Sequence, residues 1–578
     1  MKYLRKLGIF LLVGIMIMSL AGCGASKKTS SGSGTFEGQA KGKNGTIKVE
    51  VTIENKEIKK IDVIENHESE FTKDTFTKVI DTIIAANSAE VDAISGATIT
   101  SSAIISAVAD AVKKSGIELA PKKTTKASVK AENTSTDVVI IGAGGAGLTT
   151  AIEAKEKGAN VILIEKNAVV GGNTNFATGG LNAAGTKFQE AKGIKDSIEL
   201  FYEDTMKGGK NKNNPELVKI LTENAAKTVE WLTERGADLS DVGRMGGASV
   251  NRTHRPTGGA GVGAHLVEVL HKKAKELGVE IRTETKAVEL LVEGNKVTGV
   301  KVQVAGGAKY DIKAKAVVIT TGGFGANQEK VVKYKPELKG FGTTNGPGAT
   351  GDALDLVEPL NVELVDITEI QTHPTVVPEK NKMITEAVRG NGAILVNRQA
   401  KRFINELQTR DVVSKAELEQ EGKTAFLVFD QNVRESLSAI EKYAKLGLLT
   451  EASSVKELAE KISVDAAELE KTINTYNTYV ESKNDKDFKR PNMKTQLNKA
   501  PFYAVEVGPA VHHTMGGLKI NTKAQVINKS GKVIEGLFAA GEVTGGVHGA
   551  NRLGGNAVAD ITTYGRIAGA NAADLAKK

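Results

Sequence analysis

Cysteine is nearly absent from this sequence: the chain of 578 residues contains one, Cys23. A single cysteine excludes an internal disulfide, a cysteine-ligated iron–sulfur cluster and a Cys-x-x-Cys-His haem attachment. Any redox chemistry in this chain must therefore use a cofactor that needs no thiolate ligand.

Aromatic residues are also scarce, at 4%, and there is no run of five or six basic residues. The net charge is +8, from 77 Lys and Arg against 69 Asp and Glu, and the two signs are interspersed. These features disfavour a nucleic-acid partner and indicate a solvated, mildly basic surface. The length is enough for about three or four globular domains.

The N-terminus has the pattern of an export signal. Basic residues within 2–6 precede an apolar stretch, 7–20, that is shorter than the roughly 20 residues of a transmembrane helix. The sequence Leu-Ala-Gly-Cys at 20–23 resembles the bacterial lipobox. We therefore expect lipidation of Cys23 and an extracytoplasmic protein held at the membrane by acyl chains. The alternative is a plain signal peptide with an incidental cysteine.

The composition changes along the chain and predicts seven segments. They are a signal peptide (1–22), a flexible tether (23–34), a small domain (35–120), a linker (121–135), the first part of a large α/β domain (136–367), an inserted domain (368–511) and the second part of the α/β domain (512–578).

Within the small domain, residues 46–53 alternate with period two and predict a strand. Apolar residues at helical spacing over 101–112 predict a helix, with Thr100 and Ser101 as candidate caps. The small domain is therefore expected to be α+β.

The large region opens with a βαβ pattern. A short apolar strand at 138–142 is followed by a helical stretch at 146–157 and a second buried strand at 161–165, as in a doubly wound parallel sheet. This alternation is lost near 368–513, where residues 455–479 have a helical pattern. We expect a Rossmann-like α/β domain interrupted by an α+β capping domain.

A glycine-rich turn follows the first strand of this unit. Gly142, Gly144 and Gly147 form the pattern G-x-G-x-x-G, and Glu165 ends the second strand. Such glycines let the backbone approach a pyrophosphate at a helix N-terminus, and the carboxylate can accept a hydrogen bond from a ribose hydroxyl. A dinucleotide site is predicted here.

Two further patches favour FAD over NAD. Glycines recur at 171–174 and 179–180, and a late strand ends in Gly541-Glu542. FAD flavoproteins with this opening carry such patches because FAD lies extended and needs distal contacts. We predict non-covalent FAD. The residues expected to contact it are those of the three patches and several further positions: Gly142, Gly144, Ala146, Gly147, Glu165, Lys166, Asn173, Thr174, Gly179, Gly180, Asp352, Glu542, Ala557 and Val558.

Several longer motifs resemble the soluble fumarate reductases, flavoprotein relatives of succinate dehydrogenase, and above all the flavocytochrome c type. The similarity runs from Asp137 to the C-terminus. These motifs lie at 249–265, 371–375, 383–392, 409–411, 512–517 and 549–557. The flavocytochromes carry a multihaem domain in front, which one cysteine makes impossible here.

In place of the haem domain stands Asp-Ala-Ile-Ser-Gly-Ala-Thr at 92–98. It resembles the motif of FMN-binding domains, in which a phosphoester joins FMN to the final threonine. The resemblance implies covalent FMN on Thr98. The alternative is an unmodified strand–turn–helix with Thr98 as a helix cap.

The resemblance also implies the substrate residues. One carboxylate of fumarate would be bound by His512 and Arg552 and the other by His373 and Thr385, with Gln371 and Met383 lining the pocket. By the same resemblance, His513 and Glu542 would lie on the flavin of FAD.

The same resemblance assigns Arg410 as the proton donor, supplied through a relay of Glu386 and Arg389. From the residue alone, Arg410 would be a carboxylate clamp or a salt-bridge partner, because guanidinium normally keeps its proton. Glu386 and Arg389 are three residues apart, so both can face one side of a helical turn.

The expected electron path runs from a quinol-linked or flavin-linked membrane donor to FMN, then FAD, then fumarate, as in anaerobic respiration. An FMN transferase would be needed for maturation. Three alternatives stay open: reduction of another α,β-unsaturated acid such as urocanate or acrylate, oxidation of succinate, and electron transfer without turnover. Relatives that reduce urocanate differ at the positions of His373 and Thr385, which favours fumarate.

Overall fold

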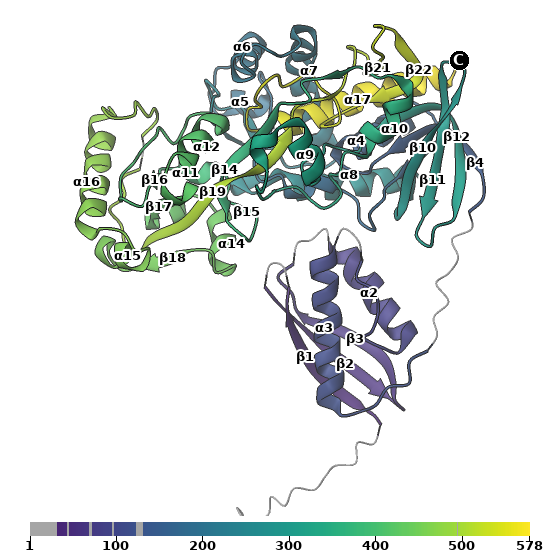
Figure 1. The fold of residues 1–578 in the computed structure, drawn as a ribbon, viewed down its shortest axis with the longest axis horizontal. Helices are drawn as coiled ribbons and strands as arrows, with labels where there is room; N and C mark the ends of the chain where they lie inside the picture. The colour runs from purple at the N-terminus through teal and green to yellow at the C-terminus, as the bar shows by residue number, and fades with distance from the viewer. Residues whose placement is uncertain (1–31, 43–44, 69–71, 95–96, 123–130, 494) are drawn as a thin grey trace, which may run out of the picture.

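The computed structural model describes residues 32–42, 45–68, 72–94, 97–122, 131–493 and 495–578 (Figure 1). The predicted signal peptide and Cys23 lie outside the described residues, as do Ser95 and Gly96 of the FMN motif and most of the predicted linker.

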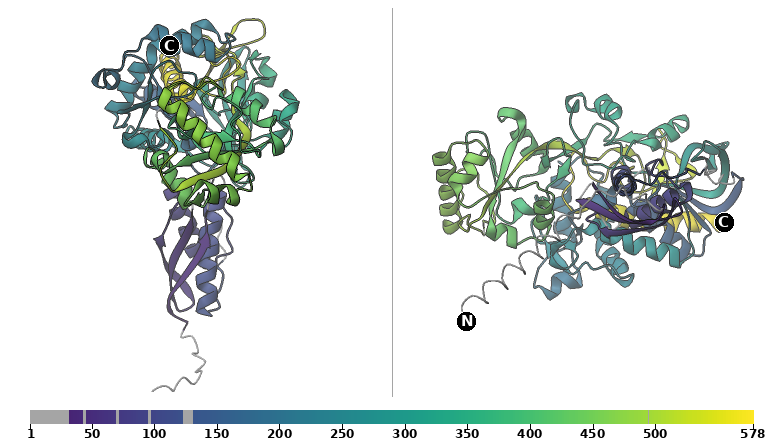
Figure 2. Two further views of the ribbon diagram at one scale, coloured as in Figure 1. Left: turned by 90° about the vertical axis from the view of Figure 1, so that its left-hand side faces the viewer. Right: turned by 90° about the horizontal axis from the view of Figure 1, so that it is seen from below.

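The N-terminal unit is a three-stranded antiparallel sheet with two helices. Its strands are β1 (Gly34–Lys41), β2 (Thr46–Glu54) and β3 (Glu57–Glu65), in the order β1-β2-β3, and its helices are α2 (Lys73–Ala86) and α3 (Thr98–Ser115). Figures 1 and 2 show this unit as a separate body that projects from the rest of the molecule.

The period-two pattern of β2 places alternate side chains in the core of this unit. Ile47, Val49, Val51 and Ile53 are fully buried and form one cluster with residues of α3. The helix begins three residues before the predicted range, and its N-cap is Ala97. The predicted caps were therefore wrong: Ser101 lies inside the helix, where its Oγ donates to the Ala97 carbonyl at 3.0 Å.

The large unit is built on an eight-stranded mixed sheet in the order β10-β11-β22-β12-β4-β5-β9, with β21 paired to β22. The strands are β4 (Thr134–Ile141), β5 (Val161–Ile164), β9 (Glu280–Arg282), β10 (Thr285–Glu293), β11 (Lys296–Val304), β12 (Lys309–Ile319), β21 (Gln525–Ile527) and β22 (Val533–Ala539). Because β4 begins at Thr134, the predicted linker was two residues too long at its C-terminal end.

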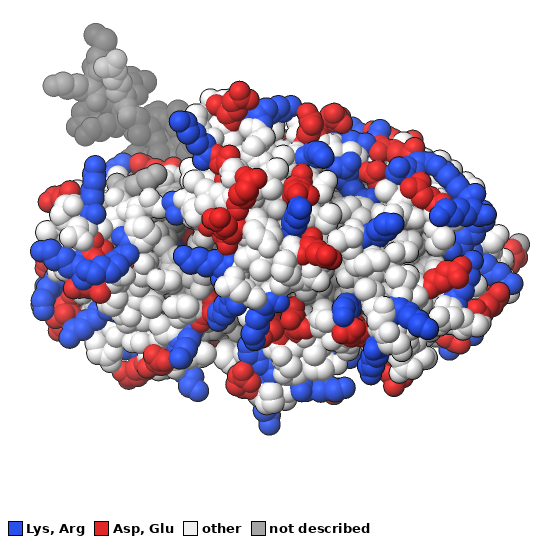
Figure 3. All heavy atoms as spheres, turned by 90° about the horizontal axis from the view of Figure 1, so that it is seen from above, with Lys and Arg blue, Asp and Glu red and all other residues white. Residues whose placement is uncertain are grey.

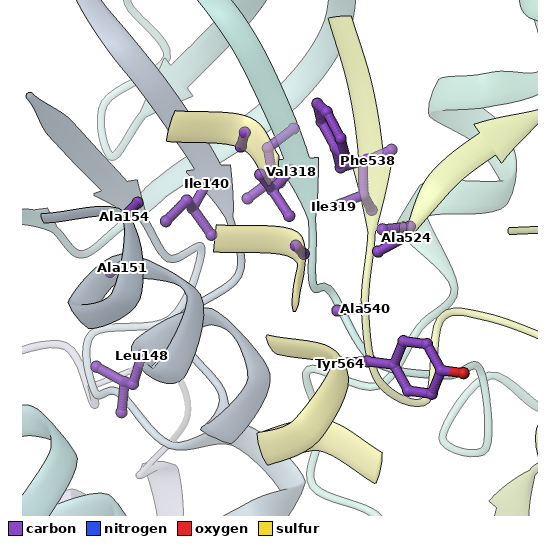
Figure 4. Packing of buried hydrophobic residues seen from close by; sticks show 14 of the residues in the cluster. Ile140, Leu148, Ala151, Ala154, Val318, Ile319, Ala524, Phe538, Ala540 and Tyr564 are labelled. Carbon is purple, nitrogen blue, oxygen red and sulfur yellow. The ribbon is translucent and has the colours of Figure 1, made fainter. Parts of the chain in front are cut away.

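Parallel strands form the centre of this sheet and are buried on both faces. Ile140 of β4, Val318 of β12 and Phe538 of β22 are neighbours across three adjacent strands (Figure 4). A strand covered on both faces reads as a continuous apolar run, which is the pattern of residues 138–141.

The first and last helices of the large unit pack closely against each other. A Cβ on Gly569 of α17 (Asn556–Ala576) would lie 2.5 Å from the Thr150 carbonyl of α4 (Gly145–Glu156), so only glycine permits this approach. Thr150 Oγ1 also lies 3.0 Å from the Gly565 carbonyl. The C-terminal segment thereby completes the domain that the βαβ unit opens.

The inserted unit has its own sheet, in the order β15-β14-β19-β17-β16 with β18 beside β19. Its core extends from Ile384 to Val507. The predicted helical stretch at 455–479 is two helices, α15 and α16. The elements are β14 (Ile370–Val377), β15 (Lys382–Met383), α11 (Ala387–Gly390), β16 (Ile394–Val396), α12 (Arg410–Leu418), β17 (Ala425–Asp430), α13 (Gln431–Glu435), α14 (Ala439–Lys445), β18 (Thr450–Ala452), α15 (Val455–Lys461), α16 (Ala466–Ser482) and β19 (Phe502–Thr514).

The remaining regular elements complete the large unit. They are β6 (Leu181–Asn182), α5 (Lys187–Ala191), α6 (Ile198–Gly208), α7 (Pro215–Glu234), β7 (Asp241–Gly243), β8 (Thr253–Arg255), α8 (Val262–Glu276), α9 (Gln328–Tyr334), α10 (Asp352–Val357), β13 (Leu364–Val365) and β20 (Gly517–Leu518), with short 3-10 turns between them.

Strands β14 and β19 connect the inserted unit to the α/β sheet of the large unit. Their ends, at Ile370 and Val511, pack with Phe324, Val331 and Leu338, outside the core of the inserted unit. Residues at these ends therefore lie between the inserted unit and the α/β sheet.

The surface carries mixed charge. Figure 3 shows basic and acidic side chains interspersed over one face, as the sequence predicts. In the part of the chain that the structure describes, no helix has both the length and the apolar character needed to cross a bilayer.

The inserted unit contains a buried ion cluster centred on Glu406. This carboxylate accepts from Arg402 at 2.8 Å and from Arg490 at 2.9 Å, and all three side chains are nearly inaccessible. We predict that Glu406→Gln lowers the free energy of unfolding of this unit by about 3–5 kcal/mol, because two guanidinium groups lose their buried counter-charge.

Urea unfolding followed by circular dichroism measures this effect. The matched control is Glu457→Gln, which breaks the exposed Lys461–Glu457 pair and should leave the transition unchanged. Equal transitions for the two variants would contradict a structural role for the cluster.

Candidate active site

A cavity opens at the carboxyl ends of β4 and β5, where ligands bind in open α/β sheets. We call it the dinucleotide cavity. Its walls include eight residues predicted to contact FAD: Gly142, Gly144, Ala146, Glu165, Lys166, Asn173, Thr174 and Asp352. Glu542 also lines the cavity, from the loop after β22. The cavity therefore unites sequence patches that lie 400 residues apart, at Gly142 and Glu542.

The three glycines of the turn are needed for different reasons. Gly142 has φ +105°, which L side chains rarely adopt, and a Cβ on Gly147 would lie 1.9 Å from the Gly142 carbonyl. At these two positions glycine is needed for the backbone conformation and packing of the turn, whether or not a ligand is bound. Gly144 has an ordinary φ of −73°, and the nearest atom to a Cβ there is 3.9 Å away. The space in front of Gly144 is therefore open for a ligand.

Charged groups are fixed along the wall. Glu165 accepts from the backbone N–H groups of Ala143 and Asn167, each at 2.9 Å. Burial raises the pKa of Glu165, and these hydrogen bonds oppose the rise. Lys166 Nζ donates to Asp352 Oδ2 at 2.9 Å, so the structure brings together two predicted residues that are far apart in sequence. This donor and acceptor set fits the ribose and phosphates of a dinucleotide.

Other predicted FAD residues lie outside the cavity wall. Gly147 packs the turn, and a Cβ on Gly180 would lie 2.4 Å from the His254 carbonyl. Ala557 and Val558 are in the first turn of α17, whose N–H groups lack partners within the helix. Contacts from Gly179, Gly180, Ala557 and Val558 to FAD therefore stay predictions.

The candidate substrate site, which we call the arginine cluster, is centred on Gln371 of β14. Gln371 Oε1 accepts from Arg410 Nη1 at 3.0 Å and from Arg552 Nη2 at 3.2 Å. Two guanidinium groups thus converge on one neutral oxygen. The remaining members of the cluster are Arg389, Glu386, His373 and His512.

The register of β14 and β19 brings the histidines to this cluster. Gln371 faces His513 across the ladder, but Thr372 faces Val511, so His512 is an extra residue that forms a β-bulge. The His373 and His512 rings are 5.1 Å apart. Consecutive residues of a regular strand point to opposite faces of the sheet. The extra residue at the bulge changes this alternation and so sets the direction of the His512 side chain.

The cluster has more buried positive than negative charge. Three guanidinium groups, those of Arg389, Arg410 and Arg552, lie at the cluster, and among the described residues Glu386 is the one carboxylate that forms an ion pair with any of them. Burial lowers the pKa of Arg552 to about 9, and the Arg410 charge adds to the effect. Excess positive charge without counter-ions makes this a site for an anion.

The histidines of the site are uncharged near neutral pH. Burial, together with the nearby arginines, lowers the pKa of His373, His512 and His513 well below the ordinary value. The Thr375 backbone N–H donates to His373 Nδ1 at 3.3 Å. Nδ1 is therefore an acceptor, and the proton of the neutral ring is on Nε2. His373 can thus donate a hydrogen bond to a carboxylate.

The first step of the predicted relay is formed. Arg410 Nε donates to Glu386 Oε2 at 2.8 Å, and the Gly246 N–H donates to Glu386 Oε1 at 2.7 Å. Burial alone would raise the pKa of Glu386, but the charges of Arg410 and Arg389 keep it below the ordinary value.

Arg389, the last predicted residue of the relay, is not hydrogen-bonded to Glu386, so its role in the relay stays a prediction. It is 1% exposed, and its Nη1 donates to the Glu406 carbonyl at 2.6 Å. Its Nε and Nη2 have no hydrogen-bond partner among the described residues. Arg389 and Glu386 interact through their charges.

The structure adds residues that the sequence did not single out. Tyr443 of α14 accepts from the Thr385 N–H at 2.9 Å, and Thr344 Oγ1 is 2.7 Å from His512 Nδ1. Asn551 holds the Gln371 amide at 2.6 Å. Tyr443 and Thr344 lie outside the motifs, so no local pattern could have found them. Met383 is half-buried on β15 opposite Val376, and its place in the pocket stays a prediction.

His513 and Glu542 connect the cluster to the dinucleotide cavity. His513 Nδ1 lies 3.6 Å from Glu542 Oε2, and Glu542 lines the cavity. Burial raises the pKa of Glu542. The two sites are therefore adjacent, as hydride transfer between a bound dinucleotide and a substrate requires.

Thr98, the predicted FMN attachment residue, is exposed at the first position of α3. Its Oγ1 is 3.5 Å from the Ile94 carbonyl. A contact joins this unit to the large one: Lys78 Nζ of α2 donates to the Ala168 carbonyl at 3.0 Å. Ala168 follows Lys166 of the cavity wall by two residues.

Comparisons with known proteins agree with this geometry. Residues 137–558 match the FAD binding domain family, and residues 42–113 match the FMN-binding domain family. Fumarate reductase (cytochrome) of Shewanella frigidimarina is 53% identical over 464 residues, which are 80% of this chain and 81% of that protein. The chain belongs to the fumarate reductase flavoprotein family.

A solved structure and a second relative extend the match. The open conformation of a flavocytochrome c3 fumarate reductase has a TM-score of 0.66 and 45% identity, covering 77% of this chain and 79% of that one. Urocanate reductase of Eggerthella lenta is 36% identical and covers 97% of this chain and 96% of that protein. The predicted fold class, the FAD-binding and FMN-binding domains and the oxidoreductase class are confirmed.

The open space at Gly144 can be tested by filling it with a larger side chain. Gly144→Val should fold normally, because its Cβ meets no protein atom closer than 3.9 Å, but its side chain should fill the space that FAD needs. We expect FAD affinity to fall about 5- to 150-fold, since overpacking costs about 1–3 kcal/mol. Flavin absorbance of the purified protein measures the loss, and the unfolding temperature of the FAD-free forms is the control. Full FAD content in the variant would contradict this placement.

Proposed function

We propose that this protein is an extracytoplasmic fumarate reductase that forms succinate. The observation that carries the proposal is the arginine cluster, in which Arg410 and Arg552 converge on Gln371 beside the dinucleotide cavity. A dicarboxylate supplies the two negative charges that the cluster lacks.

Fumarate is an alkene between two carboxylates, and this chain has binding groups for both ends. Arg552 and His512 would hold one carboxylate, and His373 and Thr385 the other. The planar guanidinium of Arg552 suits a bidentate carboxylate contact. Hydrogen bonds at both ends polarise the double bond as charge develops, and they hold it in a reactive orientation.

FAD, when bound and reduced, supplies a hydride to one alkene carbon. The second carbon needs a proton, and Arg410 is the positioned donor. Its Nε donates a hydrogen bond to the Glu386 carboxylate, which can return a proton after each turnover. In the remaining step, Arg389 passes a proton to Glu386. Burial of Gln371, His373 and Arg552 keeps bulk water from competing as the proton source.

Other substrates use the same machinery. Urocanate and acrylate also carry an alkene beside a carboxylate, but neither has the second carboxylate. The pair His373 and Thr385 favours a substrate with two. Succinate oxidation uses the same groups in reverse, and the FAD potential decides the direction. A non-catalytic electron carrier would not need the Arg410–Glu386 pair.

The proposed electron path enters through the N-terminal unit. A quinol-linked or flavin-linked membrane donor would reduce FMN, held covalently on Thr98 after attachment by an FMN transferase. The Lys78–Ala168 contact supports this path, because it brings the FMN-binding unit to the segment next to the cavity wall. Lipidation of Cys23 after removal of residues 1–22 would hold the protein at the outer face of the membrane.

We predict that Arg410→Ala abolishes fumarate reduction and leaves FAD bound, because the proton donor touches the substrate but not the cavity wall. Anaerobic oxidation of reduced methyl viologen by fumarate measures the rate. The control is Arg398→Ala, which removes a partly exposed arginine paired with Glu506 in the same unit. Substantial residual activity in Arg410→Ala would overturn the assignment.

We predict that Thr98→Ala loses FMN and loses reduction by the membrane donor, but keeps activity with reduced methyl viologen, which reaches FAD directly. Thr82→Ala removes another exposed helix threonine of the same unit and serves as the control. If both activities survive in Thr98→Ala, FMN is not the relay.

A further inference from the structure

One backbone donor of the candidate substrate site is held by a side chain from a separate helix. The Thr385 N–H donates to the Tyr443 hydroxyl of α14 at 2.9 Å, and both residues are buried. We propose that Tyr443 is a specificity-determining residue, which fixes Thr385 so that the Thr385 hydroxyl binds the second carboxylate of a dicarboxylate. This inference rests on the proposed function. It makes Tyr443 a positioning residue that acts through Thr385 rather than by touching the substrate.

Thr385 needs this support because it lies just beyond a strand. β15 pairs with β14 and ends at Met383. One residue further on, the Ile384 N–H still donates to the Thr375 carbonyl of β14, at 2.8 Å. The next N–H, that of Thr385, donates to Tyr443 instead. A buried backbone N–H without a partner costs free energy, so the direction of Thr385 depends on a side chain from α14.

The neighbouring groups of Thr385 form a hydrogen-bonded frame. The Val388 N–H donates to the Thr385 carbonyl at 3.1 Å. Thr375 Oγ1 donates to the Ile384 carbonyl at 2.8 Å, and the Thr375 N–H donates to His373 Nδ1 at 3.3 Å. The two predicted ligands of the second carboxylate, His373 and Thr385, thus belong to one frame. The contact from α14 is the part of this frame that comes from a different element.

Helix α14 is itself anchored near this contact. Ile440 and Tyr443, which are one turn apart, form its buried face. At the start of the helix, Ser438 Oγ donates to the Gly258 carbonyl of the large unit at 3.2 Å. The Tyr443 hydroxyl therefore meets Thr385 from a helix that is fixed both to the core of the inserted unit and to the large unit.

A tyrosine hydroxyl accepts this hydrogen bond without adding charge to the site. Burial raises the pKa of Tyr443 to about 12, and the hydrogen bond from Thr385 opposes the rise. The hydroxyl is therefore neutral near neutral pH, and it does not offset the positive charge of Arg410 and Arg552. A carboxylate in its place would accept the same hydrogen bond but would repel an anionic substrate.

The test uses the full-length, FAD-loaded protein with reduced methyl viologen as donor. Tyr443→Phe keeps the ring and removes the hydroxyl that holds Thr385. We expect KM for fumarate to rise about 2- to 12-fold, the range of one neutral hydrogen bond, with little change in kcat because ground state and transition state share the contact. The value of kcat/KM for acrylate, which has no second carboxylate, should not change. Titration calorimetry of the oxidised protein with fumarate should give a weaker Kd by the same factor.

The matched control is Tyr476→Phe. Tyr476 of α16 is also buried in the inserted unit, but its hydroxyl has no hydrogen-bond partner among the described residues. Removing that hydroxyl should leave KM, kcat and the Kd of fumarate at their wild-type values.

A double-mutant cycle separates positioning from a general effect on the fold. Thr385→Val removes the hydroxyl that Tyr443 is proposed to direct, and it should raise KM for fumarate by itself. If Tyr443 acts through that hydroxyl, adding Tyr443→Phe to Thr385→Val should change KM no further. Independent effects that multiply in the double variant would contradict the inference.

The outcomes separate this inference from the proposed function. If wild type does not reduce fumarate, the proposed function fails. If wild type is active and Tyr443→Phe matches Tyr476→Phe, or changes fumarate and acrylate kinetics equally, the inference fails alone. Loss of FAD or of cooperative unfolding in Tyr443→Phe would also overturn it, because the hydroxyl would then have a structural role.

Discussion

Buried positive charge without a counter-ion is the constraint on which the rest of this structure depends. Arg410 and Arg552 converge on the single oxygen of Gln371, and Glu386 is the one carboxylate directly paired with either guanidinium in the described residues. Such an arrangement is stable only if the surrounding fold is rigid and if an anion can enter. Burial, together with the same arginine charges, lowers the pKa of these histidines and keeps them neutral, so that they act as hydrogen-bond donors rather than as bases.

The fold supplies that rigidity at the junction of two cores. β14 and β19 carry Gln371, His373 and His512 from the inserted unit to the α/β sheet, and the bulge at His512 sets its direction. Arg552 precedes α17, which packs against α4 through glycines that permit close approach. The substrate groups and the dinucleotide cavity are therefore positioned by the same helices and strands.

Much of this was predictable from sequence, for physical reasons. The period-two alternation of apolar residues predicted β2, and the continuous apolar run predicted β4. Gly142 and Glu165 predicted the position of the cavity, because the backbone must turn there and approach a ligand. Other features were not predictable. The start of α3 depends on packing rather than on a side-chain cap, so Thr100 and Ser101 misled the prediction. The contact between Tyr443 and Thr385 arises from tertiary packing of α14, which no local pattern encodes.

The most direct test of the account is the ratio of kcat/KM for fumarate to that for acrylate, measured with reduced methyl viologen under anaerobic conditions. The two substrates share an alkene and one carboxylate, and they differ in the second carboxylate. If the cluster binds both ends, fumarate should be preferred by about a hundredfold, since hydrogen bonds to a charged group are worth about 1.5–3 kcal/mol. Equal values for the two, or a preference for acrylate, would contradict a dicarboxylate site built from His373, Thr385, His512 and Arg552.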